Sequence, residues 1–424
     1  MHFVQRAPEL DPVLYSIFVK IFSDRQVLDM CDISIWFRFF ILFALVEGIA
    51  SGTNASKPFE QIKISLVIES PGNELYSVYG HAGFRIREKE PAKDYFFHYG
   101  LFNFSAPGFY THFLQGLLLY KMGGQYFSAL YKEAELEGRG LYELSLDLDS
   151  AQTMQLYQLL HTNYKKENRP YYYDFLYDNC ATKPRDLLEK VLGDKLMYAD
   201  TFPKKTYRQL LSEHQRVLPW IDYGIDLIIG SEVDQSIGIR DQAFLPVYLR
   251  KAFVSALVQG KPVVVEERTM IAPHVRPNLY FYQRPVFVFL LLFVLELFLF
   301  VYALRNGVSR WIHRYDLFFY SLVALMSAFI LLLWLGTNHH ITKNNWNILW
   351  LNPLFILLVI AGWWGKKGLY NLMRKVLFAL MVLVFVIGLI KVLPQPFHIA
   401  SFVLMAILVL KLGRDTLLKI AHRK

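Results

Sequence analysis

The sequence predicts an α+β domain outside the cytoplasm, followed by an all-α domain of about five membrane spans. Two features predict this division. The 424-residue chain has a mean hydropathy of +0.26, and the apolar excess lies almost wholly after residue 284. Residues 51–284 instead carry charges, turns and alternating apolar residues, which is the composition of a globular domain large enough to bury a core. Residues 285–424 form the predicted membrane domain.

Within residues 51–284, alternating apolar residues predict strands, and apolar residues at helical spacing predict helices. The predicted strands are Ile62–Ile68, Val78–Ile86, Tyr95–Tyr99, Gln125–Tyr131, Gly140–Leu146 and Val263–Met270. The predicted helices are Phe109–Leu118, Ser150–Tyr164, Cys180–Leu192, Lys204–His214 and Val247–Val258. This mixture of elements indicates an α+β fold.

Four apolar stretches of 18 to 20 residues have the length that crosses a hydrocarbon core of ~30 Å. They are Pro285–Leu304, Leu317–Gly336, Trp346–Trp364 and Val376–Leu393. A fifth stretch, Phe397–Leu412, is shorter. We expect it to span with Lys411 reaching out to the interface, and a re-entrant segment is the alternative. Glu296 lies inside the first span, where an ionisable residue marks either a functional site or a contact between helices.

Basic residues occupy alternate loops of the membrane part. Three arginines follow the first span, four Lys or Arg residues follow the third, and five end the chain, whereas the other two loops hold only Lys343 and Lys391. Because Lys and Arg stay on the cytoplasmic side, we expect a cytoplasmic C-terminus and an extracytoplasmic domain before the first span. The net charge of +9 therefore fits membrane orientation, and no basic stripe of the nucleic-acid-binding type is present.

The first 50 residues have the pattern of a signal peptide. The apolar run Phe39–Val46 follows Arg38 and precedes the small residues of Gly48–Ala50, as at a cleavage site. Because this pattern lies far from Met1, we hypothesise that translation starts at Met30. An uncleaved signal anchor is the alternative.

Cys180 is the strongest candidate for a catalytic residue. Signal cleavage would remove Cys31, the other cysteine, and leave Cys180 without a partner for an internal disulfide. It lies in the segment DNCATKPRD, where Asn179 predicts the start of a helix. A thiol in a first helical turn has a lowered pKa, and Lys183 and Arg185 add positive charge. A buried structural cysteine is the alternative.

A cysteine nucleophile needs a base, and His81 in the segment YGHAGF is the best candidate. His98 follows on the next predicted strand, where it can orient the imidazole of His81. A buried histidine without a catalytic role is the alternative for His98.

Six further residues are candidates for substrate binding. Four flank the predicted catalytic residues, and two lie in a loop on the outer side of the membrane, where they either contact an amine or a head group or are solvated. They are Tyr79, Asn179, Lys183, Arg185, His339 and His340. The chain has no G-x-S-x-G segment, no H-E-x-x-H segment, no cysteine pair for zinc and no glycine-rich phosphate loop. We therefore predict neither a cofactor nor a metal.

The segments YGHAGFRI and YDFLYDNCATKPRD, in this order, resemble those of the Lnb-type lipoprotein N-acyltransferases of Bacteroidetes. The resemblance extends from about Lys57 through the fifth span and includes the outer segment WNILWLNPL. It implies a papain-like, circularly permuted (NlpC/P60-like) periplasmic domain joined to helices in the bacterial inner membrane. The family pattern has Asn where this chain has His98.

The resemblance implies an acyltransferase that moves an acyl chain from a phospholipid to the N-terminal amine of a diacylated lipoprotein. Cys180 would carry the acyl group as a thioester and His81 would be the base. The partners would be these two substrates and membrane lipids, without nucleic acid. The nearest alternative is a papain-like hydrolase of cell-wall peptides or lipid esters, and the second is a non-enzymatic membrane sensor or assembly factor.

Overall fold

The computed structural model describes residues 62–89, 93–103, 105–274 and 279–421. The predicted signal region and the start at Met30 lie outside these residues. Residues Phe59–Lys424 group into one compact unit, so the N-terminal domain and the C-terminal helices can be described together.

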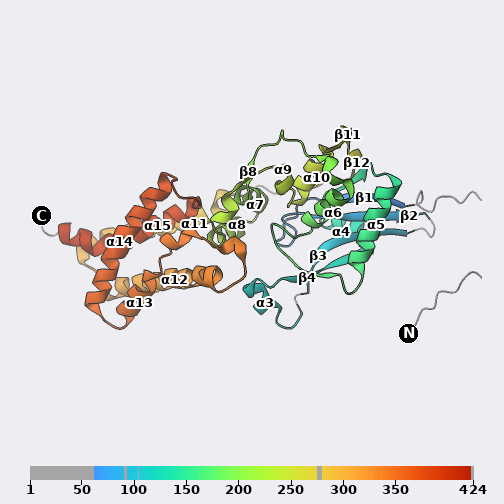
Figure 1. Cartoon of the computed structure of the whole chain (residues 1–424). Coiled ribbons are helices and arrows are strands. Elements are labelled where there is room, and N and C mark those ends of the chain that lie inside the picture. The colour runs from blue at the N-terminus through green and yellow to red at the C-terminus, as the bar shows by residue number, and fades with distance from the viewer. Residues whose placement is uncertain (1–61, 90–92, 104, 275–278, 422–424) are drawn as a thin grey trace, which may run out of the picture. The chain divides into compact units, whose positions relative to one another are not determined.

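A seven-stranded antiparallel sheet forms the centre of the N-terminal domain, in the order β12-β5-β1-β2-β3-β4-β6 (Figure 1). Alternate residues of a strand face opposite sides of the sheet. In β1, Leu66 and Ile68 therefore join the main core, while Val67 packs on the other face with Phe96. The strands are β1 (Ile62–Glu69), β2 (His81–Glu88), β3 (Lys93–Leu101), β4 (Leu119–Tyr126), β5 (Leu141–Leu146), β6 (Pro170–Tyr172) and β12 (Val264–Ile271).

Helices cover both faces of this sheet. The main core is completed by α5 (Ser150–Tyr164), α6 (Thr182–Leu192) and α10 (Pro246–Val254), and α4 (Phe127–Leu136) packs on the opposite face. The predicted strands and helices are confirmed for most of the domain, so the fold class is α+β, as predicted.

The predicted strand Gln125–Tyr131 is wrong. β4 ends at Tyr126 and α4 begins at the next residue. Phe127, Leu130 and Ala134 are the buried residues of α4, and their spacing places them on one helical face. A strand was predicted because only seven residues were considered, whereas the spacing of the buried residues along the whole segment is helical.

Shorter elements connect the sheet to the C-terminal helices. The helices among them are α3 (Phe109–Gln115), α7 (Tyr207–Gln215), α8 (Pro219–Ile228) and α9 (Ile239–Gln242), with 3-10 turns at Gly193–Lys195, Ser231–Asp234 and Phe281–Gln283. The strands among them are β7 (Leu196–Met197), β8 (Lys205–Thr206), β9 (Ser236–Ile237), β10 (Leu257–Val258) and β11 (Lys261–Pro262).

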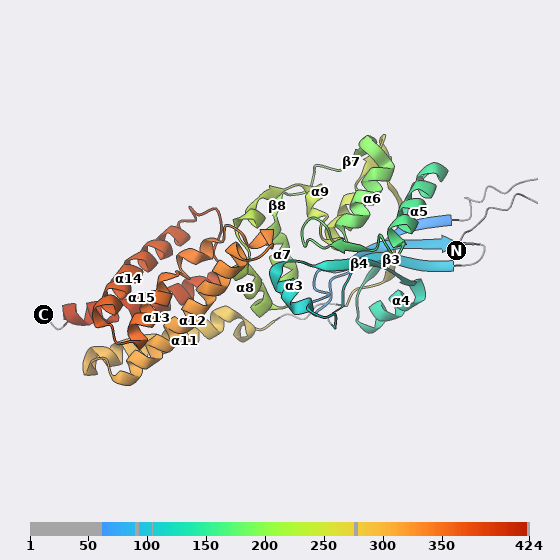
Figure 2. The same cartoon turned by 60° about the horizontal axis from the view of Figure 1, so that its bottom comes forward.

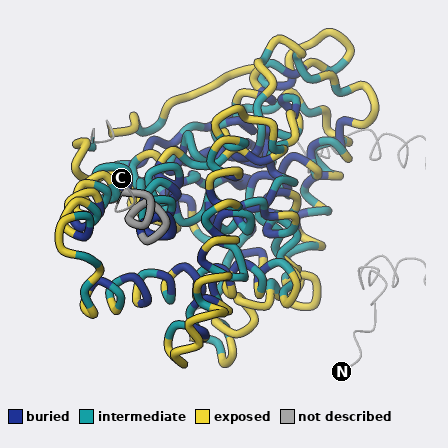
Figure 3. The backbone as a smooth tube through the Cα atoms, turned by 90° about the vertical axis from the view of Figure 1, so that its left-hand side faces the viewer, coloured by how far each residue is buried: buried dark blue, intermediate teal, exposed yellow. Residues whose placement is uncertain are grey.

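The C-terminal part is helical, as Figure 2 shows. Its helices within the described residues are α11 (Pro285–Asn306), α12 (Arg310–Leu335), α13 (Leu354–Trp363), α14 (Lys367–Leu389) and α15 (Ile399–Ala421). Buried and exposed residues alternate along them (Figure 3). Many exposed side chains, such as Phe298, Leu325 and Leu383, are large and apolar, which is expected where helices face lipid.

Three of these helices, α11, α12 and α14, are long and apolar enough to cross a membrane. The predicted third span is not one straight helix, because the segments His340–Leu349 and Leu354–Trp363 meet at a bend of 57°. Pro353 lies at this bend, and proline cannot continue a helix that precedes it. If the bent pair forms one span, the described residues hold up to four. That α15 is a fifth span stays a prediction.

Four charged side chains, the charge quartet, are buried together between α11, α12 and α15. Lys411 Nζ lies 2.8 Å from Glu296 Oε1 and 2.9 Å from Asp316 Oδ1, and Arg414 contacts the same two carboxylates at 3.1 Å and 2.9 Å. Lys411 is 1% exposed, so the expectation that it reaches the interface is wrong. Of the two roles considered for Glu296, the structure supports the contact between helices.

Residues 336–346, the outer loop, follow α12 and contact the N-terminal domain. The N–H of Gly230 donates to the carbonyl of Ile341 at 2.8 Å, and Asn345 Nδ2 donates to the carbonyl of Leu227 at 2.8 Å. The outer loop is therefore fixed to the end of α8 and to the residues that follow it.

Candidate active site

The loop before α6 holds Cys180 in place through Asn179. Asn179 is 4% exposed, and its Oδ1 accepts hydrogen bonds from the N–H groups of Ala181 and Thr182 at 2.8 Å and 3.0 Å. Its Nδ2 donates to two backbone carbonyls at 2.8 Å and 3.0 Å. All polar atoms of this side chain are used inside the protein, so Asn179 anchors the loop and is not placed for the predicted substrate contact.

Cys180 lies just before α6, whose first residue is Thr182 and whose N-cap is Ala181. Cys180 is partly exposed as a residue, but burial of its thiol in the surrounding protein raises the thiol pKa to about 12. The backbone N–H groups of Ala82 and Cys180 face the sulfur and act against this shift. The predicted lowering of the thiol pKa is therefore wrong, because desolvation of the charged form outweighs the helix terminus.

β2 and β3 separate next to Cys180. Their paired register ends at Gly83 and His98, and β3 is irregular beyond that point. Gly100 lies here at φ +96°, a conformation that favours glycine. The Cβ that it lacks would lie 3.8 Å from Cys180 Cβ. The end of the sheet thus opens where the side chain of Cys180 meets the N–H of Ala82.

His81 and His98 form a pair across these two strands. His81 Nε2 lies 2.7 Å from His98 Nδ1, and the ring of His98 stacks on Phe96 at 5.1 Å. Burial lowers the pKa of His98 to about 4. Burial, followed by the charges of His98 and Arg139, lowers the pKa of His81 well below its usual range. Both rings are therefore neutral at pH 7, and a His81 that donates from Nε2 keeps Nδ1 as a proton acceptor.

The basic residues and the tyrosine predicted near the thiol have other partners. Lys183 forms an ion pair with Asp178 at 2.7 Å and stays half-exposed. Arg185 is buried and bonded to the neighbouring aspartate and to a backbone carbonyl. Tyr79 accepts a hydrogen bond from Gln215. Arg185 and Tyr79 therefore have partners within the protein, and substrate contact by Lys183, Arg185 and Tyr79 stays a prediction.

Sequence reasoning missed a buried ion pair at the same end of the sheet. Arg139 Nη2 lies 3.1 Å from Glu69 Oε2, and Glu69 is opposite His81 in the β1–β2 register. Burial raises the pKa of Glu69 to about 7 although Arg139 lowers it. The charge of Glu69 raises the pKa of the Cys180 thiol, and that of Arg139 lowers it. The available signal was an acidic residue that ends an otherwise apolar strand.

The outer-loop histidines contact the N-terminal domain. His340 Nδ1 lies 3.0 Å from Asp174 Oδ2, and this hydrogen bond raises the pKa of His340. Asp174 also accepts hydrogen bonds from the N–H groups of Leu176 and Tyr177 at 2.9 Å. His339 Nε2 lies 2.8 Å from a carbonyl oxygen of α3. The outer loop therefore supports the segment that leads to Cys180, and substrate contact by these histidines stays a prediction.

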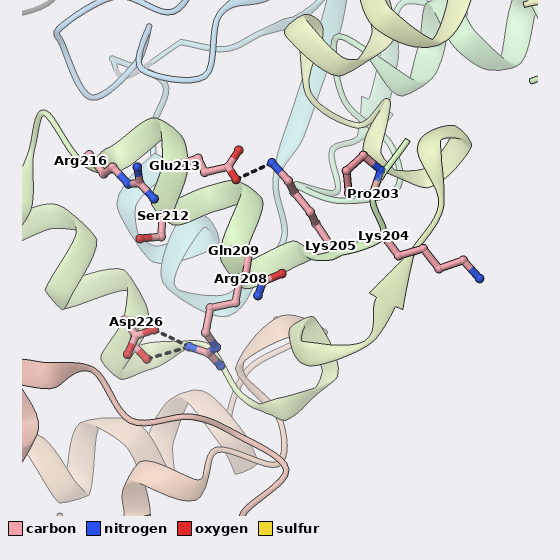
Figure 4. A pocket seen from close by; sticks show the side chains of 9 residues that line it. All are labelled: Pro203, Lys204, Lys205, Arg208, Gln209, Ser212, Glu213, Arg216 and Asp226. Atoms are coloured by element: carbon pink, nitrogen blue, oxygen red, sulfur yellow. Dashed lines mark hydrogen bonds and ion pairs between the residues drawn. The ribbon is translucent and has the colours of Figure 1, made fainter. Parts of the chain in front are cut away.

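A polar recess of about 530 Å³ lies along α7, apart from Cys180 (Figure 4). Most of its charges are paired with one another. Arg208 contacts Asp226 at 2.7 Å, and Lys205 contacts Glu213 at 2.6 Å. None of the residues predicted to be catalytic lines it.

Within the described ranges, no group of three or more His, Cys, Asp or Glu side chains is arranged to hold a metal ion. Residues 53–213 match the family model of the Lnb N-terminal periplasmic domain, and residues 278–423 match that of the Lnb transmembrane domain. Searches of curated proteins and of solved structures gave no match. Both parts of the chain thus match domains of one family. The chain belongs to the Lnb family of lipoprotein-processing enzymes of the inner membrane, with its N-terminal domain in the periplasm.

Proposed function

We propose that this protein is a lipoprotein N-acyltransferase that moves an acyl chain from a membrane phospholipid to the N-terminal amine of a diacylated lipoprotein. One observation carries the proposal. The thiol of Cys180 lies against the N–H of Ala82, the residue after His81, whose other side is bonded to His98. The proposed nucleophile, base and orienting group therefore belong to neighbouring segments at one end of the sheet, which supports the proposal.

In the first half-reaction, the sulfur of Cys180 attacks the ester carbonyl carbon of the donor lipid. With a thiol pKa of about 12, only about one thiol in 10⁵ is ionised at pH 7. The proton therefore passes to Nδ1 of His81 during the attack, as in general base catalysis. The N–H groups of Ala82 and Cys180 face the sulfur, and in the proposed mechanism they donate to the oxyanion that develops beside it.

Collapse of this intermediate breaks the carbon–oxygen bond to the glycerol. His81 returns its proton to the leaving oxygen, which departs as the hydroxyl of a lysophospholipid, and the acyl group stays on Cys180 as a thioester. The free amine of the lipoprotein then attacks the thioester carbon. The amine loses one proton and the sulfur of Cys180 regains one, so the products are an amide and the original thiol.

The membrane helices suit this chemistry because both substrates are lipids. Extracting an acyl chain into water costs about 0.8 kcal/mol per CH₂ group, so a catalytic domain fixed at the membrane surface avoids this cost. We take residues 51–284 as the periplasmic domain and residues 285–424 as the membrane domain. The basic loops support a cytoplasmic C-terminus.

The test is mass spectrometry of lipoprotein N-termini from cells with the protein, without it, and with Cys180→Ser. We expect the N-acyl group to be present only with the unaltered protein. Purified protein incubated with phospholipid alone should carry one added acyl mass on Cys180. Unchanged lipoprotein N-termini in all three strains would refute the proposal, and loss of the acyl group as free fatty acid would favour a hydrolase.

A further inference from the structure

The short helix α3 exposes an unusual amount of apolar surface. None of its seven residues is buried, and Tyr110, Phe113 and Leu114 are 73%, 48% and 42% exposed. The surrounding residues 102–119 contain no Asp, Glu, Lys or Arg. A water-exposed surface loop normally carries charge, and contiguous exposed apolar patches mark contact with a protein, a ligand or a membrane.

The position of α3 distinguishes between these partners. The N–H of Asn338 donates to the carbonyl of Gln115 at 2.8 Å, and His339 Nε2 contacts the carbonyl oxygen of Phe113 at 2.8 Å. The long apolar helix α12 ends at Leu335, three residues before the first of these contacts. Figure 2 shows α3 beside this end of α12. The helix is therefore held at the level where a span leaves the hydrocarbon core.

Other exposed aromatic residues mark the same level of the membrane. Tyr280, Phe281 and Tyr282 are exposed and come directly before α11, the first candidate span. Trp220 of α8 is also exposed and contacts Phe289 of α11 at 5.8 Å. Tyr and Trp gather at membrane–water interfaces, so the outer leaflet is the partner that fits α3.

A continuous row of aromatic rings, the aromatic track, leads from α3 toward the thiol. Phe109 of α3 stacks with Phe102 at 5.9 Å, Phe102 lies 4.9 Å from Tyr120, and Tyr120 stacks with Tyr173 at 4.5 Å. The ring of Tyr173 lies 3.8 Å from the Cβ position of Gly100.

Cys180 is the other side chain at that position, because its Cβ also lies 3.8 Å from the Cβ that Gly100 lacks. A larger residue at Gly100 would crowd the place where the aromatic track meets the thiol. A row of uncharged aromatic side chains thus connects α3 with the surroundings of Cys180.

We propose that α3 inserts into the outer leaflet of the membrane and that the aromatic track guides an acyl chain of the donor lipid from this leaflet to Cys180. This inference rests on the acyl-transfer function proposed above. The apolar rings would shield the chain from water while its ester carbonyl reaches the sulfur. The lipid would not have to leave the bilayer completely before it reacts.

The location of α3 can be tested without any enzymatic activity. A nitroxide spin label is placed on Leu114→Cys in full-length protein whose two native cysteines are serine, reconstituted in phosphatidylethanolamine and phosphatidylglycerol vesicles. The matched control is Leu136→Cys. Leu136 is the last residue of α4 and is 88% exposed. We expect the label at 114 to collide mainly with oxygen, which dissolves in lipid, and the label at 136 mainly with a water-soluble nickel chelate.

Access of the nickel chelate to the label at 114 equal to that at 136 would overturn the inference. Protection of the label at 114 from both reagents would also overturn it, because a protein partner would then cover α3. Since this measurement needs no turnover, it still decides where α3 lies if the protein proves not to be an acyltransferase.

The role of α3 in lipid delivery is tested by comparing acyl transfer from a membrane lipid with acylation by a water-soluble ester. Tyr110→Asp with Leu114→Asp should lower acyl transfer from vesicle phospholipid by at least about tenfold, while acylation of Cys180 by a water-soluble short-chain ester stays unchanged. Leu136→Asp should change neither rate. Equal loss of both rates, or loss of neither, in the α3 variant would refute a specific role in lipid delivery.

Discussion

Replacing Lys411 with Met should destabilise the membrane domain far more than replacing an exposed lysine. Lys411 is ion-paired with both Glu296 and Asp316. Its loss leaves two buried carboxylates with one cation, Arg414. Removing one partner of a buried ion pair costs about 3–5 kcal/mol, because the remaining charge stays desolvated.

The charge quartet offers its own control. In Lys411→Met combined with Glu296→Gln, the remaining Arg414 and Asp316 are 2.9 Å apart and carry no net charge. The double variant should therefore be less destabilised than the single one, although it has lost more ion pairs. Lys375 is exposed on α14, so Lys375→Met should change the stability by less than about 0.5 kcal/mol.

The assay is thermal unfolding of the full-length protein in detergent, followed by tryptophan fluorescence. At about 2 °C per kcal/mol for a protein of this size, Lys411→Met should lower the Tm by about 5–10 °C. The double variant should recover at least half of that loss. A loss of less than about 1 °C in the single variant, or a larger loss in the double variant, would refute the charge-balance reasoning.

Three further predictions concern the periplasmic domain. His98→Ala removes the hydrogen-bond partner of His81, the proposed base, and should slow acylation of Cys180 by about 10²- to 10⁴-fold. His98→Asn should restore much of the rate, and equal rates in both variants would contradict the orienting role of His98. Glu69→Gln removes a charge that raises the pKa of the Cys180 thiol. The pH midpoint for alkylation of Cys180 by iodoacetamide should therefore fall, and a midpoint that stays or rises would contradict this effect of Glu69. The contact with Asp174 raises the pKa of His340. This contact therefore stabilises the outer loop fully below about pH 6.5, and the stabilisation is lost as the pH rises through the raised pKa of His340. Amide exchange in the outer loop, corrected for intrinsic rates, should be faster at pH 9 than at pH 6, and His340→Gln should abolish this difference.

The pairing of His81 with His98 could be predicted because the two histidines lie on strands that follow each other in the chain. β2 and β3 pair in the sheet, so His81 and His98 on these adjacent strands are expected to meet, and their ring nitrogens lie 2.7 Å apart. The polar, turn-forming segment around Cys180 stood out because an Asn next to a cysteine has a local capping role. Asn179 does accept hydrogen bonds from the following N–H groups. The N-cap of α6 is Ala181, however, so Cys180 precedes the helix and the prediction that it lies in the first helical turn is wrong.

The electrostatic state of Cys180 could not be predicted, because it depends on packing between distant segments. The helix terminus and Lys183 suggested a thiolate, but Lys183 is neutralised by Asp178. Burial of the thiol depends on where β3 departs from β2, and Gly100 sets that point by adopting φ +96°. A glycine in a strand indicates only that some irregularity is possible.

The membrane part shows the same limit. Apolar length located the helices, but Lys411 was expected at the interface because a single span contains no partner for it. Its two carboxylates come from helices that lie about one hundred residues earlier, as the separation of 95 positions from Asp316 shows. The bend at Pro353 could have been predicted from the proline itself, but a prediction based only on the length of the apolar stretch does not take the proline into account.

The charge quartet also constrains how the protein is made. Inserted alone, α15 would bring Lys411 and Arg414 into the hydrocarbon region at about 2.5–3.5 kcal/mol each, which offsets much of the gain from its apolar residues. Glu296 and Asp316 precede them in the chain, so the carboxylates are already in place when α15 leaves the ribosome. Insertion of α15 into lipid alone is then unfavourable, whereas insertion beside α11 and α12 lets its two cations pair with their carboxylates. Biogenesis of this enzyme is therefore expected to follow the order of its helices, with α15 depending on α11 and α12.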